Sequence, residues 1–137
     1  MVETEIDASN TWFLQKLADG ETAAAATAYE EHAVLLPPVG EAITGRKAIE
    51  IFWQSGIEIG VQAVELEPLE RRQAARVVCE IGRYRFVLQR AEDQPTLEHG
   101  AYFAFHRHGP DGSWLRLVDS FNREPSPTSA SAWVTRR

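Results

Sequence analysis

The sequence predicts an α+β fold, in which three N-terminal helices pack into the concave face of a strongly bent, mostly antiparallel sheet. Apolar residues recur at helical spacing up to about residue 60 and alternate with polar residues after it, as in strands with one solvated face. Between the second and third expected helices, a short apolar strand over residues 34–36 runs into Pro37 and Pro38, which cannot continue a helix. These observations place the helices first and most of the sheet last.

The helices are expected at about residues 6–17, 23–32 and 45–60. The second is rich in alanine, so it can approach a neighbouring element closely, and it ends near His32. The third ends at Gly60 and carries an apolar face made of Ile49, Phe52, Trp53 and Ile57. That face needs a partner surface, and the strands downstream can supply it.

The strands are expected at residues 64–67, 76–88, 97–107 and 114–122, the last two forming a hairpin. Pro68 should put the first strand at an edge or a bulge of the sheet. In the third strand the odd positions are the apolar ones: Ala101, Phe103 and Phe105. In the last strand, simple alternation places Asp119 in line with Leu115, Leu117 and Phe121, so a carboxylate shares a face with three large apolar groups.

A chain of 137 residues is normally one domain, which we assign to residues 1–123. Residues 124–137 are rich in Pro, Ser and Thr and are expected to form a flexible tail. The net charge of -6 argues against nucleic acid as a partner, because phosphate binding requires clustered Lys and Arg. With Cys79 as the single cysteine, an internal disulfide and a thiolate metal cluster are excluded.

The sequence has no basic and apolar leader at its start and no apolar run that could span a bilayer, so we expect a cytoplasmic protein without membrane contact. His106 and His108 have a spacing compatible with one metal ion, but no third ligand is identifiable. We therefore expect no metal and no cofactor.

Several motifs resemble one known family. The run AYEEHAVLLPPVGEAITGRKAIEIFW, followed by EIGRY, GAYFAF and SWLRLVDSFN, is similar to the SnoaL-like polyketide cyclases of the nuclear transport factor 2-like and ketosteroid-isomerase-like superfamily. The resemblance covers residues 6–123. It implies a cone-shaped α+β barrel with an apolar pocket, usually a homodimer joined through the sheet. Fold does not by itself decide function, since one scaffold hosts many chemistries.

The resemblance also bears on the catalytic groups. It places the Tyr and the two Asp positions of steroid isomerases at Phe13, Pro37 and Ala101, none of which supplies the required group. It places the acid/base Asp of the SnoaL-like cyclases at Asp119. The Asp that usually ends the second helix is replaced by His32, which is either a general base or a helix cap.

From the residues, Asp119 is either a proton-transfer group with a perturbed pKa or an ionised structural anchor. Glu80 and Tyr84 flank Gly82 on one strand face, so they are a partner acid and a phenol donor, or else core residues with Glu80 paired to an arginine. Gly82 leaves room for a ligand or for close approach of another segment. The catalytic candidates are thus Asp119, Glu80 and Tyr84.

The residues expected to line the pocket are mostly aromatic, although the sequence does not separate a pocket wall from a core. They are Trp12, Phe13, Tyr29, His32, Leu35, Phe52, Trp53, Phe86, Ala101, Phe103, Phe105, Leu117 and Phe121.

The predicted function is cofactor-free acid/base catalysis, as a cyclase, isomerase or hydratase, on a small apolar molecule that is ring-containing or isoprenoid-like. A non-catalytic binding module and a dimerisation domain with a filled core are the alternatives.

Overall fold

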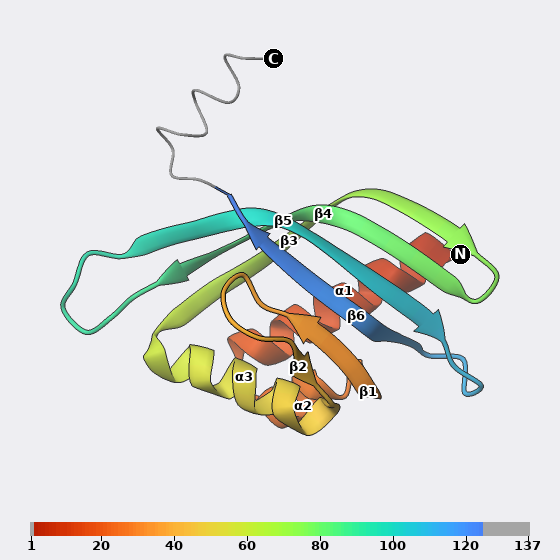
Figure 1. Cartoon of the computed structure of the whole chain (residues 1–137), viewed down its shortest axis with the longest axis horizontal. Helices are drawn as coiled ribbons and strands as arrows, with labels where there is room; N and C mark the ends of the chain where they lie inside the picture. The colour runs from red at the N-terminus through yellow and green to blue at the C-terminus, as the bar shows by residue number, and fades with distance from the viewer. Residues whose placement is uncertain (1, 125–137) are drawn as a thin grey trace, which may run out of the picture.

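The computed structural model describes residues 2–124, and the expected tail lies outside them except for Glu124. Figure 1 shows a strongly bent sheet with the helices gathered on one side of it. In chain order the elements are α1 (Val2–Ala18), α2 (Thr22–Ala26), β1 (Tyr29–Leu36), β2 (Ile43–Thr44), α3 (Arg46–Ile59), β3 (Val61–Ala74), β4 (Val77–Leu88), β5 (Thr96–His108) and β6 (Trp114–Arg123). No helix among residues 2–124 is long and apolar enough to cross a membrane.

The strands form a sheet in the order β2-β1-β6-β5-β4-β3, and every neighbouring pair is antiparallel except β1 with β6. The predicted α+β layout with a bent, mostly antiparallel sheet is confirmed. Within the described residues β2 and β3 remain free edges, so the sheet is a cone that does not close into a barrel. Pro68 lies in edge strand β3 next to a register shift. At this position the missing N–H of proline removes no hydrogen bond between two interior strands of the sheet.

The second helix is shorter than predicted. It ends at Ala26, and Tyr29–Leu36 is a strand that pairs with both β2 and β6. His32 therefore lies exposed within β1 and does not cap a helix. The reason is tertiary, because two neighbouring strands satisfy the backbone of this segment and outweigh its local preference.

The faces of the last two strands also differ from the prediction. In β5 the buried residues are Tyr102, Ala104 and His106, while the set Ala101, Phe103 and Phe105 lies on the outer face of the sheet. In β6 a bulge leaves Leu117 without a partner, because Phe105 pairs with Val118 and His106 with Arg116. The bulge turns Arg116 and Asp119 to the same, helix-facing side, which simple alternation does not allow.

The core lies between the helices and the concave face. Along α1 the buried residues Ile6, Asn10, Phe13 and Leu17 recur at helical spacing. The Phe13 ring packs edge-to-face against Tyr29 at 5.7 Å and Trp53 at 5.8 Å between ring centroids. Helix α3 ends as predicted at Gly60, whose left-handed φ of 117° suits a glycine at a helix end.

Candidate functional site

The first polar group on the concave face is a cluster sealed under α1, which we call the buried cluster: Asn10, Tyr29, Glu80, Tyr102, His106, Arg116 and Asp119. Glu80 accepts hydrogen bonds from Asn10 Nδ2 at 3.1 Å, from Arg71 Nε at 3.0 Å and from the Tyr102 hydroxyl. Burial alone would raise the pKa of Glu80, but the contacts with His106 and Tyr102 and the charge of Arg116 outweigh it and hold that pKa well below its usual range.

Asp119 occupies the other half of the buried cluster. Its Oδ2 accepts a hydrogen bond of 2.7 Å from the Tyr29 hydroxyl, and its Oδ1 lies 3.3 Å from Arg116 Nη1. Arg116 also donates to Asn10 Oδ1, and its guanidinium lies over the Phe13 ring at 4.9 Å. Both ions are fully buried, so each depends on the other for compensation.

The buried cluster is joined to the wall of the candidate site through one hydrogen bond, and Arg71 joins it separately to the exposed Asp7. Trp53 Nε1 donates to the Tyr29 hydroxyl over 3.2 Å, and burial raises the pKa of that phenol well above its usual value. The Tyr29 hydroxyl thus joins the carboxylate of Asp119 to the indole of Trp53.

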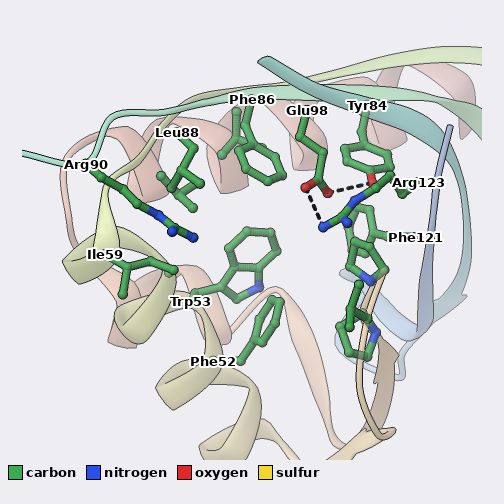
Figure 2. A pocket seen from close by; sticks show the side chains of 16 residues that line it. Phe52, Trp53, Ile59, Tyr84, Phe86, Leu88, Arg90, Glu98, Phe121 and Arg123 are labelled. Carbon is green, nitrogen blue, oxygen red and sulfur yellow. Dashed lines mark hydrogen bonds and ion pairs between the residues drawn. The ribbon is translucent and has the colours of Figure 1, made fainter. Parts of the chain in front are cut away.

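A cavity of about 300 Å³ lies beside the buried cluster, between α3, the Pro37–Val39 turn and the ends of β3 to β6. Figure 2 shows its walls, with Trp53 and Phe52 facing Phe86 and Leu88 across the open space. The complete lining is Pro37, Pro38, Val39, Phe52, Trp53, Gly56, Ile59, Val61, Val64, Tyr84, Phe86, Leu88, Arg90, Glu98, Phe121 and Arg123.

One wall of the cavity carries a second polar group, which we call the cavity cluster: Tyr84, Glu98 and Arg123. Glu98 accepts a hydrogen bond of 3.0 Å from the Tyr84 hydroxyl and one of 2.8 Å from Arg123 Nη2 (Figure 2). Burial, reinforced by the charge of Glu98, raises the pKa of Tyr84, so the phenol keeps its proton. The result is a carboxylate with a phenol and a guanidinium on an otherwise apolar wall.

The structure divides the residues expected at the site. Tyr84, Phe52, Trp53, Phe86 and Phe121 line the cavity. Asp119 and Glu80 lie in the buried cluster and do not line it. The three predicted catalytic side chains therefore do not converge on one point.

Other expected lining residues lie elsewhere for separate reasons. Phe13, Tyr29 and Leu35 are buried in the core. Trp12 is 40% exposed because it lies off the buried face of α1, where Lys16 approaches its ring at 5.7 Å. His32 is exposed on β1. Leu117 lies at the bulge of β6, and the other three residues lie on the outer face of the sheet, so none of them lines the cavity: Ala101, Phe103 and Phe105.

Sequence reasoning missed Glu98, Arg123 and Arg90. A signal for Glu98 was available in the even positions of β5. Glu98 pairs with Phe86 and Gly100 pairs with Tyr84, so these positions share the face that carries the expected pocket residues. Glycine supplies a second signal: a Cβ at Gly100 would clash first with the Asn122 carbonyl oxygen and then lie 2.9 Å from the Tyr84 ring. A Cβ at Gly82 would clash first with the Glu67 carbonyl oxygen and then lie 2.6 Å from the Tyr102 ring. Both glycines thus allow close approach of a neighbouring strand and of a tyrosine ring, and the expected gap at Gly82 is filled rather than open to a ligand.

Solved structures of similar shape identify the fold. A ketosteroid isomerase-like protein from Erwinia carotovora atroseptica superposes with a TM-score of 0.78 at 18% identity, covering 90% of this chain and 96% of that chain. An NTF2-like protein with a cystatin-like fold from Novosphingobium aromaticivorans gives 0.76 at 15% identity, covering 95% and 86%. The chain has the nuclear transport factor 2-like fold.

Aln2 from a Streptomyces species shares this fold as well, with a TM-score of 0.78 at 13% identity, covering 99% of this chain and 96% of that chain. No family model matches the sequence, and no curated protein matches it. At these identities the likeness concerns the nuclear transport factor 2-like fold, and the resemblance seen in the sequence is confirmed at that level. The chemistry has to be argued from the cavity.

Proposed function

We propose that this protein binds a small, largely apolar molecule, ring-containing or isoprenoid-like, in the cavity beside Trp53 and acts on it by cofactor-free acid/base chemistry. The observation that carries the proposal is the carboxylate of Glu98, which lies with Tyr84 and Arg123 on the wall of a cavity whose other lining residues, Arg90 apart, are apolar. Apolar walls supply affinity through burial, and a few placed polar groups orient the ligand.

The reaction class that suits this arrangement is an isomerisation, a cyclisation or a hydration. In an isomerisation the Glu98 carboxylate accepts a proton from a carbon of the ligand next to a carbonyl group. The Glu98 carboxylic acid then returns the proton to another carbon of the same molecule, so a double bond moves and no co-reactant is consumed. Tyr84 and Arg123, which already contact Glu98, hold the carboxylate in one orientation during both steps.

In this proposal Asp119 is a positioning residue. It contacts the Tyr29 hydroxyl, which in turn accepts from Trp53 Nε1, and Trp53 forms a wall of the cavity. Asp119 therefore orients the indole against which the ligand packs, and the proton transfer falls to Glu98.

A second candidate is a binding module without turnover. Both oxygens of Glu98 already accept a hydrogen bond, one from Tyr84 and one from Arg123, which suits a group that orients a ligand without reacting. The two candidates share the cavity and differ in whether bound ligand is converted. The open space next to Trp53 favours these two candidates over the third alternative, a dimerisation domain with a filled core.

The experiment is a binding screen followed by an assay of conversion. The melting temperature is measured with a panel of aromatic polyketides, steroids and terpenoids, because a ligand that binds only the folded state raises it. Hits are then incubated with wild type, Glu98→Gln and Tyr84→Phe, with Glu67→Gln on edge strand β3 as a surface control. Conversion lost in Glu98→Gln and kept in Glu67→Gln supports the enzyme. Binding without conversion supports the module, and a panel without any shift contradicts both.

We also propose a homodimer joined through the outer face of the sheet. Phe103 and Phe105 pack edge-to-face at 5.4 Å there, and Ile81, which pairs with Phe103, is 44% exposed. Leu97, near the start of β5 and opposite Val87, is 56% exposed. The same patch on a second copy is complementary to it across a twofold axis. Sedimentation of Phe103→Glu should give a monomer while the edge-strand control Leu69→Glu stays dimeric, and a monomeric wild type would contradict the interface.

A further inference from the structure

Arg90 lies across the cavity from the cavity cluster. Figure 2 shows its side chain entering the open space beside Ile59, on the opposite side from Glu98 and Arg123. The charged residues of the lining are Arg90, Glu98 and Arg123, and the last two pair with each other. Within residues 2–124 Arg90 forms no ion pair, so the cavity carries one uncompensated positive charge.

The backbone around Arg90 is held in place. Gln89 N donates to Gly60 O over 2.9 Å, which ties the segment to the end of α3. The Gln89 side chain donates to Ala91 O at 3.2 Å and Asp93 O at 2.6 Å, and Asp93 N donates back to Arg90 O at 2.8 Å. Ala91 adopts a left-handed φ of 46°, a conformation that is unfavourable in a residue other than glycine. These contacts fix the backbone from which the exposed Arg90 side chain extends toward the cavity.

We infer that the ligand is an amphiphilic organic anion whose carboxylate pairs with Arg90 and whose opposite end carries a neutral hydroxyl directed at Glu98. This rests on the proposed function and names the ligand class for the same cavity. A guanidinium matches a carboxylate with two parallel hydrogen bonds. The apolar body of the ligand then spans the walls formed by Trp53 and Phe86.

The two ends of the cavity set the orientation of the ligand. The pair of Glu98 with Arg123 leaves no net positive charge at the cavity cluster, so the anionic end is attracted more strongly to Arg90. A hydroxyl at the cavity cluster can donate to Glu98 and accept from Arg123. The protein has a net charge of -6, so attraction of an anion depends on this local cation. The pair with Arg90 therefore sets specificity for anions as well as orientation.

The test uses three probes with one ring system: a hydroxynaphthoate, the corresponding hydroxynaphthamide and naphthoate without the hydroxyl. Dissociation constants are measured by calorimetry for wild type, for Arg90→Gln and Glu98→Ala, and for Lys47→Gln as a control. The Lys47 side chain is 79% exposed on α3 and does not line the cavity, and its substitution removes the same charge.

We expect wild type to prefer the hydroxynaphthoate over the hydroxynaphthamide by roughly two- to fivefold, the range of an exposed ion pair. Arg90→Gln should abolish this preference and change the affinity for the hydroxynaphthamide by less than about twofold. Lys47→Gln should keep the preference, and added salt should reduce it in wild type. Naphthoate without the hydroxyl should bind more weakly than the hydroxynaphthoate in wild type and equally to it in Glu98→Ala, which removes the acceptor.

The outcomes separate this inference from the proposed function. Equal affinity of wild type for acid and amide, or an equal loss of both in Arg90→Gln, overturns the role of Arg90 and leaves ligand binding in the cavity intact. An affinity for naphthoate equal to that for the hydroxynaphthoate in wild type overturns the hydroxyl at Glu98. No binding of any of the probes to wild type contradicts both the inference and the proposed function for ring-containing ligands.

Discussion

The concave face of the sheet carries the same trio of chemical groups twice. In the buried cluster Asp119 accepts from the Tyr29 hydroxyl and pairs with Arg116, and all three residues are at most 1% exposed. In the cavity cluster Glu98 accepts from the Tyr84 hydroxyl and pairs with Arg123, whose side chain is 53% exposed. The two trios differ in what covers them. Helix α1 places Asn10 and Phe13 over the first trio, whereas the second trio faces an open cavity. The role of a carboxylate is thus decided by what covers it.

If the buried cluster is structural, removing its cation has the largest effect. We expect Arg116→Met to lower the free energy of unfolding by about 3–5 kcal/mol, because it leaves the buried Asp119 without its compensating charge. Urea denaturation measures the loss. Arg72→Met, which breaks an exposed pair with Glu70 on β3, should cost less than about 1 kcal/mol. Equally small losses of unfolding free energy in both variants would contradict a structural role for the buried cluster.

The link from the buried cluster to the cavity wall is tested at Tyr29. Tyr29→Phe removes one hydrogen bond to Asp119 and leaves Trp53 Nε1 without its acceptor, so we expect a loss of about 1–3 kcal/mol. The same measurement on Tyr84→Phe should show a smaller loss, because Glu98 keeps Arg123 and has access to water. A larger loss in Tyr84→Phe would mean that the cavity cluster carries more of the stability.

Acidification should also separate the two regions, through His106. Its ring is fully buried and its nitrogens make no hydrogen bond within the described residues, and burial lowers its pKa despite Glu80, whose Oε1 lies 3.4 Å from Nε2. Arg116, which also faces this group, opposes protonation too, whereas Asp119 favours it.

The folded state therefore excludes a proton that the unfolded state binds below pH 6.5. Stability from this residue is complete above pH 6.5 and should fall by up to about 1.4 kcal/mol per pH unit below it. Unfolding curves from pH 7 to pH 5.5 should be flatter for His106→Gln than for wild type, while the exposed control His32→Gln should follow wild type. Parallel slopes in all three proteins would place the acid sensitivity elsewhere.

The smallest stability effect is expected at the cavity cluster. Glu98→Gln should change the free energy of unfolding by less than about 1 kcal/mol, because its pair with the half-exposed Arg123 is screened by water. Its effect should show in ligand affinity and conversion instead. A loss comparable to that of Arg116→Met would identify Glu98 as a structural anchor and weaken the proposed function.

Local signals in the sequence determined much of the fold of this protein. The change from helical to alternating period, the Pro37–Pro38 turn and Gly60 give the α+β class and the extent of α3, because periodicity and backbone restriction act within a few residues. Burial of Tyr84 beside Gly82 also followed from the alternation within one strand. The anomaly of Asp119 among apolar groups was visible without any structure.

What only the tertiary structure decided depends on contacts between distant segments. The bulge at Leu117 turns Arg116 and Asp119 to one side, and α1 then seals them with Asn10, more than a hundred positions earlier in the chain. Glu98 and Arg123 meet Tyr84 because β4, β5 and β6 are neighbours in the sheet. Residue type and spacing carry no information on which of two similar trios a helix will cover, since coverage follows from how the whole chain packs.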